Sequence, residues 1–122
     1  MRYVDFRTLL RLAQGIQGDP EVRDYSVLTA AVARHEAVLM GRLVFTRPVD
    51  AAAALLHTIV ALKPLTFGND ILGWVAGYTL LGLNGIKVGA DPQAAVNFVR
   101  TASAEGWDER QISDGLARFV IS

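Results

Sequence analysis

The chain has 122 residues, of which 52% are apolar and 20% are charged, and it contains no cysteine. This length is typical of one compact domain, and a chain of this size buries roughly two thirds of its unfolded surface, so residues 1–122 are expected to form a single domain. The absence of cysteine excludes a disulfide scaffold, a thiolate zinc site and a cysteine nucleophile. Twelve basic residues balance twelve acidic ones, which argues against general nucleic-acid binding because such binding needs a positive surface.

The N-terminal segment is charged, with Arg2, Asp5, Arg7 and Arg11 in its first turns. A secretory signal needs an uninterrupted apolar stretch in this region. The segment therefore predicts no signal peptide, and the expected compartment is the cytoplasm.

The spacing of apolar residues and the positions of capping residues predict two helices in the first third of the chain. The first is expected over residues 4–16, where the glycines that follow end it. The second begins near Asp24 or Ser26 and runs to about Met40, and Gly41 ends it.

The next segment is predicted to be a short extended flap followed by a helix. Residues 43–46 are rich in β-prone side chains and are closed by Pro48. Asp50 is expected to cap an Ala- and Leu-rich helix over residues 51–62, which must end before Pro64.

The run from residue 71 to residue 86 carries no charge and contains four glycines. It has 16 residues, fewer than the ~20 that a membrane-spanning helix needs. Asn69 or Asp70 is expected to cap it, and Gly73 and Gly77 allow a neighbouring helix to approach closely. The run therefore predicts a helix buried within a bundle, and no membrane span.

The last third is predicted to hold one short strand and two helices. Residues 86–88 are expected to pair with another short strand. Asp91 caps a helix that reaches about Ala104, and Asp108 caps a final amphipathic helix that runs through Val120. The side chains of that final helix expected to face inward are Ile112, Leu116, Phe119 and Val120. Together these elements predict an all-α fold, a compact bundle of about six helices with a short β-hairpin flap.

The segment 63–71, KPLTFGNDI, joins the two apolar helices. It resembles the signature H-[PI]-F-x-[DE]-G-N-[KG]-R of the Fic/Doc family, and the chain is more similar to the short Doc (death-on-curing) members than to the long Fic enzymes. The segments VRDYSVLTAAVAR and DAAAALLHTIVALKP resemble the helices that lead to this motif, and LNGIKV resembles the element that follows it. The resemblance covers nearly the whole chain and implies a Doc-like helical domain.

Four positions depart from the family's motif. Lys63 stands where the family has a general-base histidine, and an ammonium group at neutral pH accepts no proton. Phe67 stands where the family has its acidic magnesium ligand, and its ring offers no oxygen to a cation. Asp70 replaces a lysine or glycine, and Ile71 replaces the arginine that holds the nucleotide phosphate.

Other positions of the motif are retained or still able to pack. Gly68 and Asn69 match the family and are the remnant of its anion-binding loop, while Leu65 can pack in place of the family's aromatic residue. Asp70 in the first helical turn interacts favourably with the helix dipole. The same carboxylate repels a triphosphate and competes for the backbone amides that would bind the phosphates. The resemblance implies ATP and Mg²⁺ as cofactors, but these departures lead us to expect no cofactor and no metal site.

The two histidines lie outside this motif. His57 lies in the Ala- and Leu-rich helix and is interpreted as a packed side chain. His35, beside Glu36, lies toward the end of the second predicted helix, where a cation interacts favourably with the dipole. They do not have the spacing of metal ligands.

Three functions remain open. The preferred one is a Doc-like member of a toxin–antitoxin pair with an eroded active site, a pseudoenzyme that acts through protein binding; the resemblance implies a Phd-like antitoxin as partner. The second is an active enzyme with altered chemistry that transfers phosphate or AMP from ATP to a protein hydroxyl, with Lys63 as phosphate ligand or nucleophile. The third is a structural or membrane-associated protein built on residues 51–62 and 71–86. A homodimer is compatible with each of them.

Overall fold

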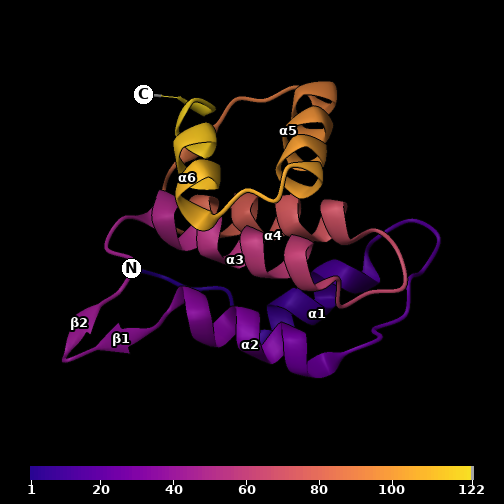
Figure 1. Ribbon diagram of the computed structural model, residues 1–122, viewed down its shortest axis with the longest axis horizontal. Helices are drawn as coiled ribbons and strands as arrows, with labels where there is room; N and C mark the ends of the chain where they lie inside the picture. The colour runs from indigo at the N-terminus through magenta and orange to yellow at the C-terminus, as the bar shows by residue number, and fades with distance from the viewer. Residues whose placement is uncertain (122) are drawn as a thin grey trace.

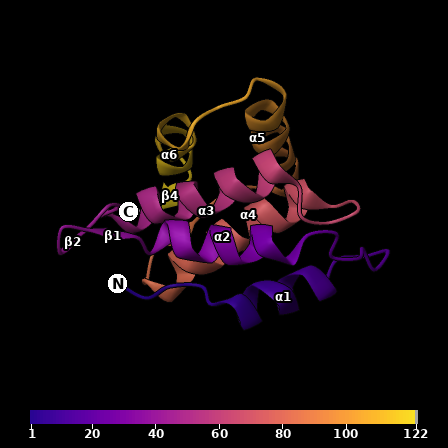
Figure 2. The ribbon, with the colours of Figure 1, turned by 60° about the horizontal axis from the view of Figure 1, so that its bottom comes forward.

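The computed structural model describes residues 1–121, which form six helices arranged in three layers of two (Figure 1). α1 (Phe6–Gln14) and α2 (Tyr25–His35) form the first layer. α3 (Pro48–Leu62) and α4 (Asn69–Leu83) form the central layer, and α5 (Pro92–Ala104) and α6 (Glu109–Ala117) form the third. Figure 2 shows the same layers from a second direction. The expected mostly helical bundle is confirmed.

α3 is the central helix and packs against α2, α4 and α6. Its four alanines, residues 51–54, are fully buried, and their small side chains let neighbouring helices approach. A Cβ at Gly73 of α4 would lie 2.8 Å from Val60 Cγ2 of α3, and a Cβ at Gly77 would lie 3.5 Å from the Ala52 carbonyl oxygen. The two glycines therefore serve the packing of α4 on α3 within one chain.

Across residues 1–121, every helix is too short or too polar to cross a membrane. The apolar run 71–86 forms most of α4, and one side of that helix is buried in the bundle. Two of the four glycines of the run, Gly73 and Gly77, face α3.

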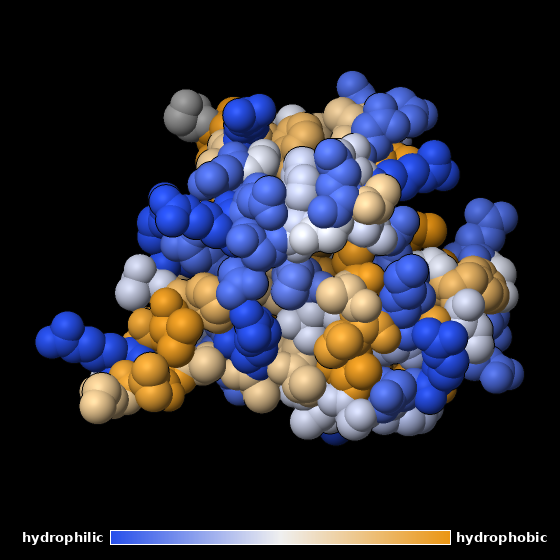
Figure 3. Space-filling view, in the orientation of Figure 1, coloured by the Kyte–Doolittle hydropathy of each residue, from blue (hydrophilic) through white to orange (hydrophobic). Residues whose placement is uncertain are grey.

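Two small antiparallel sheets accompany the helices. β1 (Val38–Leu39) pairs with β2 (Arg42–Leu43), and β3 (Lys87–Val88) pairs with β4 (Val120–Ile121). The β1–β2 hairpin protrudes from the end of the bundle where α3 begins (Figure 1). Figure 3 shows apolar side chains gathered on this arm, and Met40 at its tip is 95% exposed.

Two predictions about this part of the chain, the end of the second helix and the extent of the flap, are wrong. α2 ends at His35 instead of Met40, because Met40 and Gly41 adopt φ values of 53° and 77° and form the two-residue turn of the hairpin. In the predicted flap, residues 43–46, only Leu43 belongs to a strand. The hairpin lies at the end of the bundle opposite the connection between α3 and α4, so it does not cover that connection (Figure 1 and Figure 2).

The predicted end of the final helix is also wrong. The final helix ends at Ala117, and Val120 belongs to β4, where its side chain is partly exposed instead of facing inward. Ile112 and Leu116 are buried as predicted. The prediction that residues 86–88 pair with another short strand is confirmed, since β3 pairs with β4.

Three of the predicted N-caps are confirmed. Asp24, Asp91 and Asp108 each accept a backbone N–H at the start of α2, α5 and α6, respectively. Asp5 caps α1 in the same way, through the Thr8 N–H at 2.7 Å. An N-cap of this kind contributes about 1 kcal/mol.

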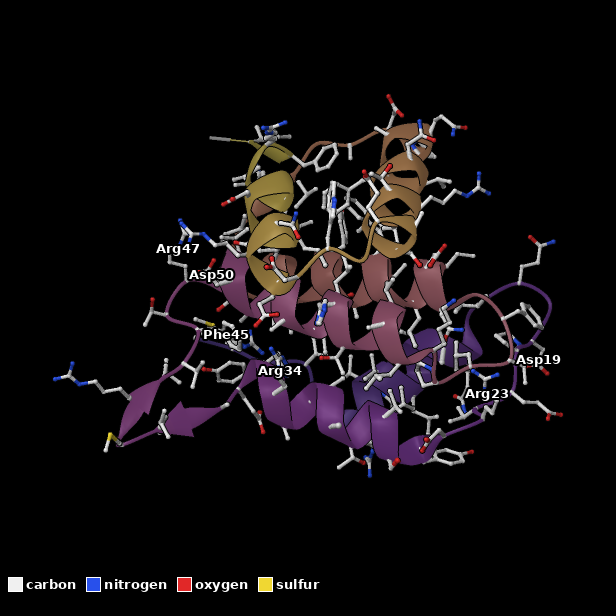
Figure 4. The ribbon with its side chains drawn as sticks, in the orientation of Figure 1. Asp19, Arg23, Arg34, Phe45, Arg47 and Asp50 are labelled. Carbon is white, nitrogen blue, oxygen red and sulfur yellow. The ribbon has the colours of Figure 1, made fainter. Side chains whose placement is uncertain are left out.

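The predicted cap at Asp50 is wrong. α3 begins at Pro48, with Arg47 as its N-cap, which places Asp50 inside the first turn. The Asp50 carboxylate accepts hydrogen bonds from Arg47 Nε at 2.9 Å and from Ser113 Oγ at 2.6 Å. The hydrogen bond from Arg47 lowers the pKa of Asp50. Arg47 and Asp50 lie together at the start of α3 (Figure 4), and Ser113 links this pair to α6.

Candidate functional site

The connection between α3 and α4 is held by the segment that joins α1 to α2. Val22 forms an antiparallel bridge with Leu65, and the Arg23 N–H donates to the Pro64 carbonyl oxygen at 2.7 Å. Arg23 Nη2 donates to the Lys63 carbonyl oxygen at 2.8 Å. Figure 4 shows Arg23 at this end of the molecule. The backbone of the connection is therefore fixed from outside its two helices.

Lys63 ends α3 in the left-handed conformation, with φ of 50°. Its N–H donates to the Ile59 carbonyl oxygen at 2.9 Å, which closes the last turn of the helix. The Lys63 side chain is exposed. The backbone of Lys63 therefore ends the helix without any contribution from its ammonium group.

Gly68 and Asn69 form the turn into α4. Gly68 is the N-cap and has φ of 78°, a conformation that favours glycine. The Asn69 side chain turns back to Leu65, accepting its N–H at 2.9 Å and donating to its carbonyl oxygen at 3.1 Å. The prediction that Asn69 or Asp70 caps α4 is therefore wrong, since no side chain caps this helix.

A cavity of about 700 Å³ opens between this turn and α5. It brings together the three residues that were predicted to form the site, Lys63, Gly68 and Asn69, with two further motif residues, Asp70 and Ile71. Trp74 of α4 also lines it, and α5 contributes Pro92, Ala95, Val96, Val99 and Arg100.

Residues 64–67 of the motif do not line this cavity. Leu65 is fully buried beneath the connection, so it packs as predicted. Phe67 is 48% exposed, and its ring lies over Gly18, where an added Cβ would be 3.1 Å from the ring. The side chain at the family's acidic-ligand position thus faces the segment between α1 and α2.

Arg100 is a lining residue that motif comparison did not find. The α5 positions that line the cavity, 92, 95, 96, 99 and 100, follow helical spacing and form one face. This stripe is visible in the sequence. The surface that it faces is set by the packing of α5 on α4, which local spacing does not encode.

Neither histidine lines the cavity. His35 is 1% exposed, and its Nε2 accepts the Val4 N–H at 3.2 Å, so the ring proton lies on Nδ1, which donates to the Val32 carbonyl oxygen at 2.6 Å. Burial lowers the pKa of His35. The expectation of a histidine cation at the end of α2 is therefore wrong, because the buried ring is neutral.

His57 lies in α3 and faces α6. Its Nδ1 is buried without a hydrogen bond and lies 3.8 Å from Glu109 Oε2. Glu109 also accepts a hydrogen bond from Arg34 Nη2 at 2.6 Å. Over residues 1–121, no three His, Asp or Glu side chains are grouped in a way that could hold a metal ion.

Comparison with known proteins complements this geometry. No protein-family model matches the chain. The toxin Doc of Mycolicibacterium smegmatis is 42% identical to it over 107 residues, which make up 86% of this chain and 82% of that protein. The similarity therefore covers most of both proteins, and the chain belongs to the Doc toxin family.

Proposed function

We propose that this Doc-family chain acts by binding a protein partner and does not transfer phosphate or AMP from ATP. The partner expected for a family member is a Phd-like antitoxin. The observation that carries the proposal is the set of titratable side chains that line the cavity at the motif, namely Lys63, Asp70 and Arg100.

This set lacks the groups that the family reaction needs. The ammonium group of Lys63 has three donors and no acceptor, so it does not take a proton from a target hydroxyl. Phe67, at the position of the acidic magnesium ligand, has no oxygen and faces Gly18. Ile71 lines the cavity where the family has its phosphate-binding arginine, and it makes that wall apolar.

Asp70 adds a second obstacle to nucleotide binding. It lies in the first turn of α4 and lines the cavity. A carboxylate there stabilises the helix through the dipole but repels the phosphates of a triphosphate. The family's anion site thus carries a negative charge of its own.

An enzyme with altered chemistry is the second candidate. The cavity holds two cationic side chains, Lys63 and Arg100, which are able to bind a phosphate group. Such an enzyme would need Asp70 or a group of its target to accept the proton. This candidate requires MgATP to bind in the cavity.

Titration calorimetry with MgATP separates these two functions. The proposal predicts no saturable binding at nucleotide concentrations up to ~1 mM, the upper end of ordinary substrate KM values. Saturable binding that is lost in Lys63→Ala would overturn the proposal. Arg110→Gln, which removes an exposed charge of α6 that does not line the cavity, is the matched control.

A further inference from the structure

The β1–β2 arm, residues 37–44, exposes a dense group of apolar side chains. Five of the seven residues from 38 to 44 are large, apolar and between 38% and 95% exposed. They are Val38, Leu39, Met40, Leu43 and Val44. Figure 3 shows this apolar surface on the protruding arm. Contiguous apolar surface on a protein commonly marks a place where another molecule binds.

The arm is also incomplete as a sheet. Within residues 1–121, β1 pairs only with β2, and neither strand has a second neighbour. An isolated two-stranded hairpin is marginally stable in water, and further strands or a packed helix stabilise it. The arm therefore offers an added strand both apolar side chains and free strand edges.

The hydrogen bonds of the arm show which backbone groups lie on its free edges. The Val44 N–H donates to the Ala37 carbonyl oxygen at 3.0 Å, and the register pairs Val38 with Leu43. Hydrogen-bonded and non-hydrogen-bonded pairs alternate along an antiparallel ladder, so Val38 and Leu43 form a non-hydrogen-bonded pair. The N–H and C=O groups of Val38 therefore point outward from the edge of β1, and those of Leu43 point outward from the edge of β2.

The two edges differ in charge. The edge of β1 follows residues 37–41, Ala-Val-Leu-Met-Gly, which include no charged residue and no proline, the usual protection of a free edge. β2 contains Arg42, which forms no ion pair among residues 1–121. A two-fold contact places a strand against its own copy. Pairing through β2 would therefore bring two Arg42 side chains together, whereas pairing through β1 brings no like charges together.

We propose that two copies of this chain associate through their β1 strands, which pair antiparallel about a two-fold axis at Val38. The Val38 N–H of each copy donates to the Val38 carbonyl oxygen of the other, and the two arms form one sheet in the order β2–β1–β1–β2. Because directly opposite residues share one face of a sheet, Val38 and Leu43 of both copies form a single apolar row.

This contact leaves the cavity at the motif open in both copies. The arm lies at the end of the bundle opposite the connection between α3 and α4 (Figure 1 and Figure 2). The inference is therefore independent of the proposed function, and a failed test of one leaves the other standing.

Sedimentation equilibrium of the unaltered chain tests the association. Each strand of the arm has two residues, so the contact belongs with transient interfaces that bury less than ~1,200 Å². We expect the mass to rise from one chain toward two between ~10 µM and ~1 mM. Val38→Lys should remain monomeric over this range, because it places two ammonium groups at the axis. Leu62→Lys, a similarly exposed apolar position on α3, is the matched control and should dimerise like the unaltered chain.

Cysteine cross-linking tests the register, because the chain has no cysteine of its own. The Cα atoms of a hydrogen-bonded pair lie about 5.5 Å apart, within the ~4.4–6.8 Å range of a disulfide. Val38→Cys should therefore form a disulfide-linked dimer on mild oxidation with diamide. Leu43→Cys on the outer strand should not, since three strand spacings of ~4.8 Å place the two copies of this residue about 14 Å apart.

Three results would overturn the proposal. The first is an unaltered chain that stays monomeric at ~1 mM, or a dimer that Val38→Lys leaves intact. The second is equal cross-linking of Val38→Cys and Leu43→Cys, which would exclude pairing through β1. The third is binding of a monomeric chain to vesicles of phosphatidylcholine and phosphatidylglycerol that is lost in Met40→Glu, which would assign the arm to a lipid surface. Circular dichroism checks that each variant is folded.

Discussion

The contact between α3 and α4 leads to a quantitative prediction for Gly73. A Cβ added at this position would lie 2.8 Å from Val60 Cγ2 and 3.5 Å from Leu56. Val60 is β-branched and lies in a helix, so it has essentially one χ1 rotamer and cannot turn aside. Gly73→Ala therefore forces the two central helices apart.

The size of the effect follows from two opposing terms. Overpacking a close-packed interior costs about 1–3 kcal/mol, whereas replacing a helical glycine by alanine gains about 1 kcal/mol. We expect Gly73→Ala to lower the free energy of unfolding by about 1–2 kcal/mol, since the rigid Val60 places the packing cost in the upper part of its range.

Gly82 of the same helix is the matched control. It is exposed, and an added Cβ would meet no atom within 4 Å. Gly82→Ala should therefore raise the free energy of unfolding by about 1 kcal/mol through helix propensity alone. Urea unfolding followed by circular dichroism at 222 nm measures both variants. If Gly73→Ala were as stable as Gly82→Ala, the close packing of α4 on α3 described here would be wrong.

Three further predictions concern single side chains. Burial lowers the pKa of His35 from 6.5, so the imidazole of the unfolded chain binds a proton at a higher pH than that of the folded chain. The free energy of unfolding should therefore fall as the pH drops below about 6.5. Urea titrations at several pH values should show this fall in the native chain and a smaller fall in His35→Gln. Lys63→Gly should raise the melting temperature, because glycine adopts φ of 50° without the ~1–2 kcal/mol cost that other residues have in the left-handed region. If Lys63→Gly melted at a lower temperature than Lys63→Ala, the left-handed conformation assigned to residue 63 would be wrong. Asp50→Ala should lower the free energy of unfolding, measured by chemical denaturation, by about 1–3 kcal/mol, because it leaves the buried Ser113 hydroxyl without its acceptor. The double variant with Ser113→Ala should recover part of that loss.

The helices could be predicted from the sequence because their signals are local. Aspartates placed directly before amphipathic runs capped α2, α5 and α6 as expected. The apolar run 71–86 forms most of α4 as predicted, and its Gly73 and Gly77 lie against α3. The type of these elements therefore followed from spacing and capping chemistry.

The errors lie where tertiary contacts override local preference. Met40 adopts a positive φ and turns a predicted helix into a hairpin. Asp50 had the right residue type for a cap, but Pro48 starts the helix earlier and the carboxylate pairs with Arg47. Asn69 is also a good capping residue, yet its amide is used to close the connection through Leu65.

The candidate site was predictable only in part. The motif resemblance placed Lys63, Gly68 and Asn69 in one loop, and they do line one cavity. The opposite wall comes from α5, which begins 21 residues after the end of the motif at residue 71 and includes Arg100. The position of this helix depends on packing. A short motif carries no information about such a wall.

The most direct test of the central claim is a transfer assay with ATP labelled on the α-phosphate in one reaction and on the γ-phosphate in another. The purified chain is incubated with Mg²⁺ and cell lysate, and Lys63→Ala and a reaction without the chain serve as controls. A protein that acts by binding adds no labelling of protein above that in the reaction without the chain, which is the predicted result. Transfer of either label to a protein, dependent on the chain and lost in Lys63→Ala, would show that the cavity is an active site and would contradict the proposed function.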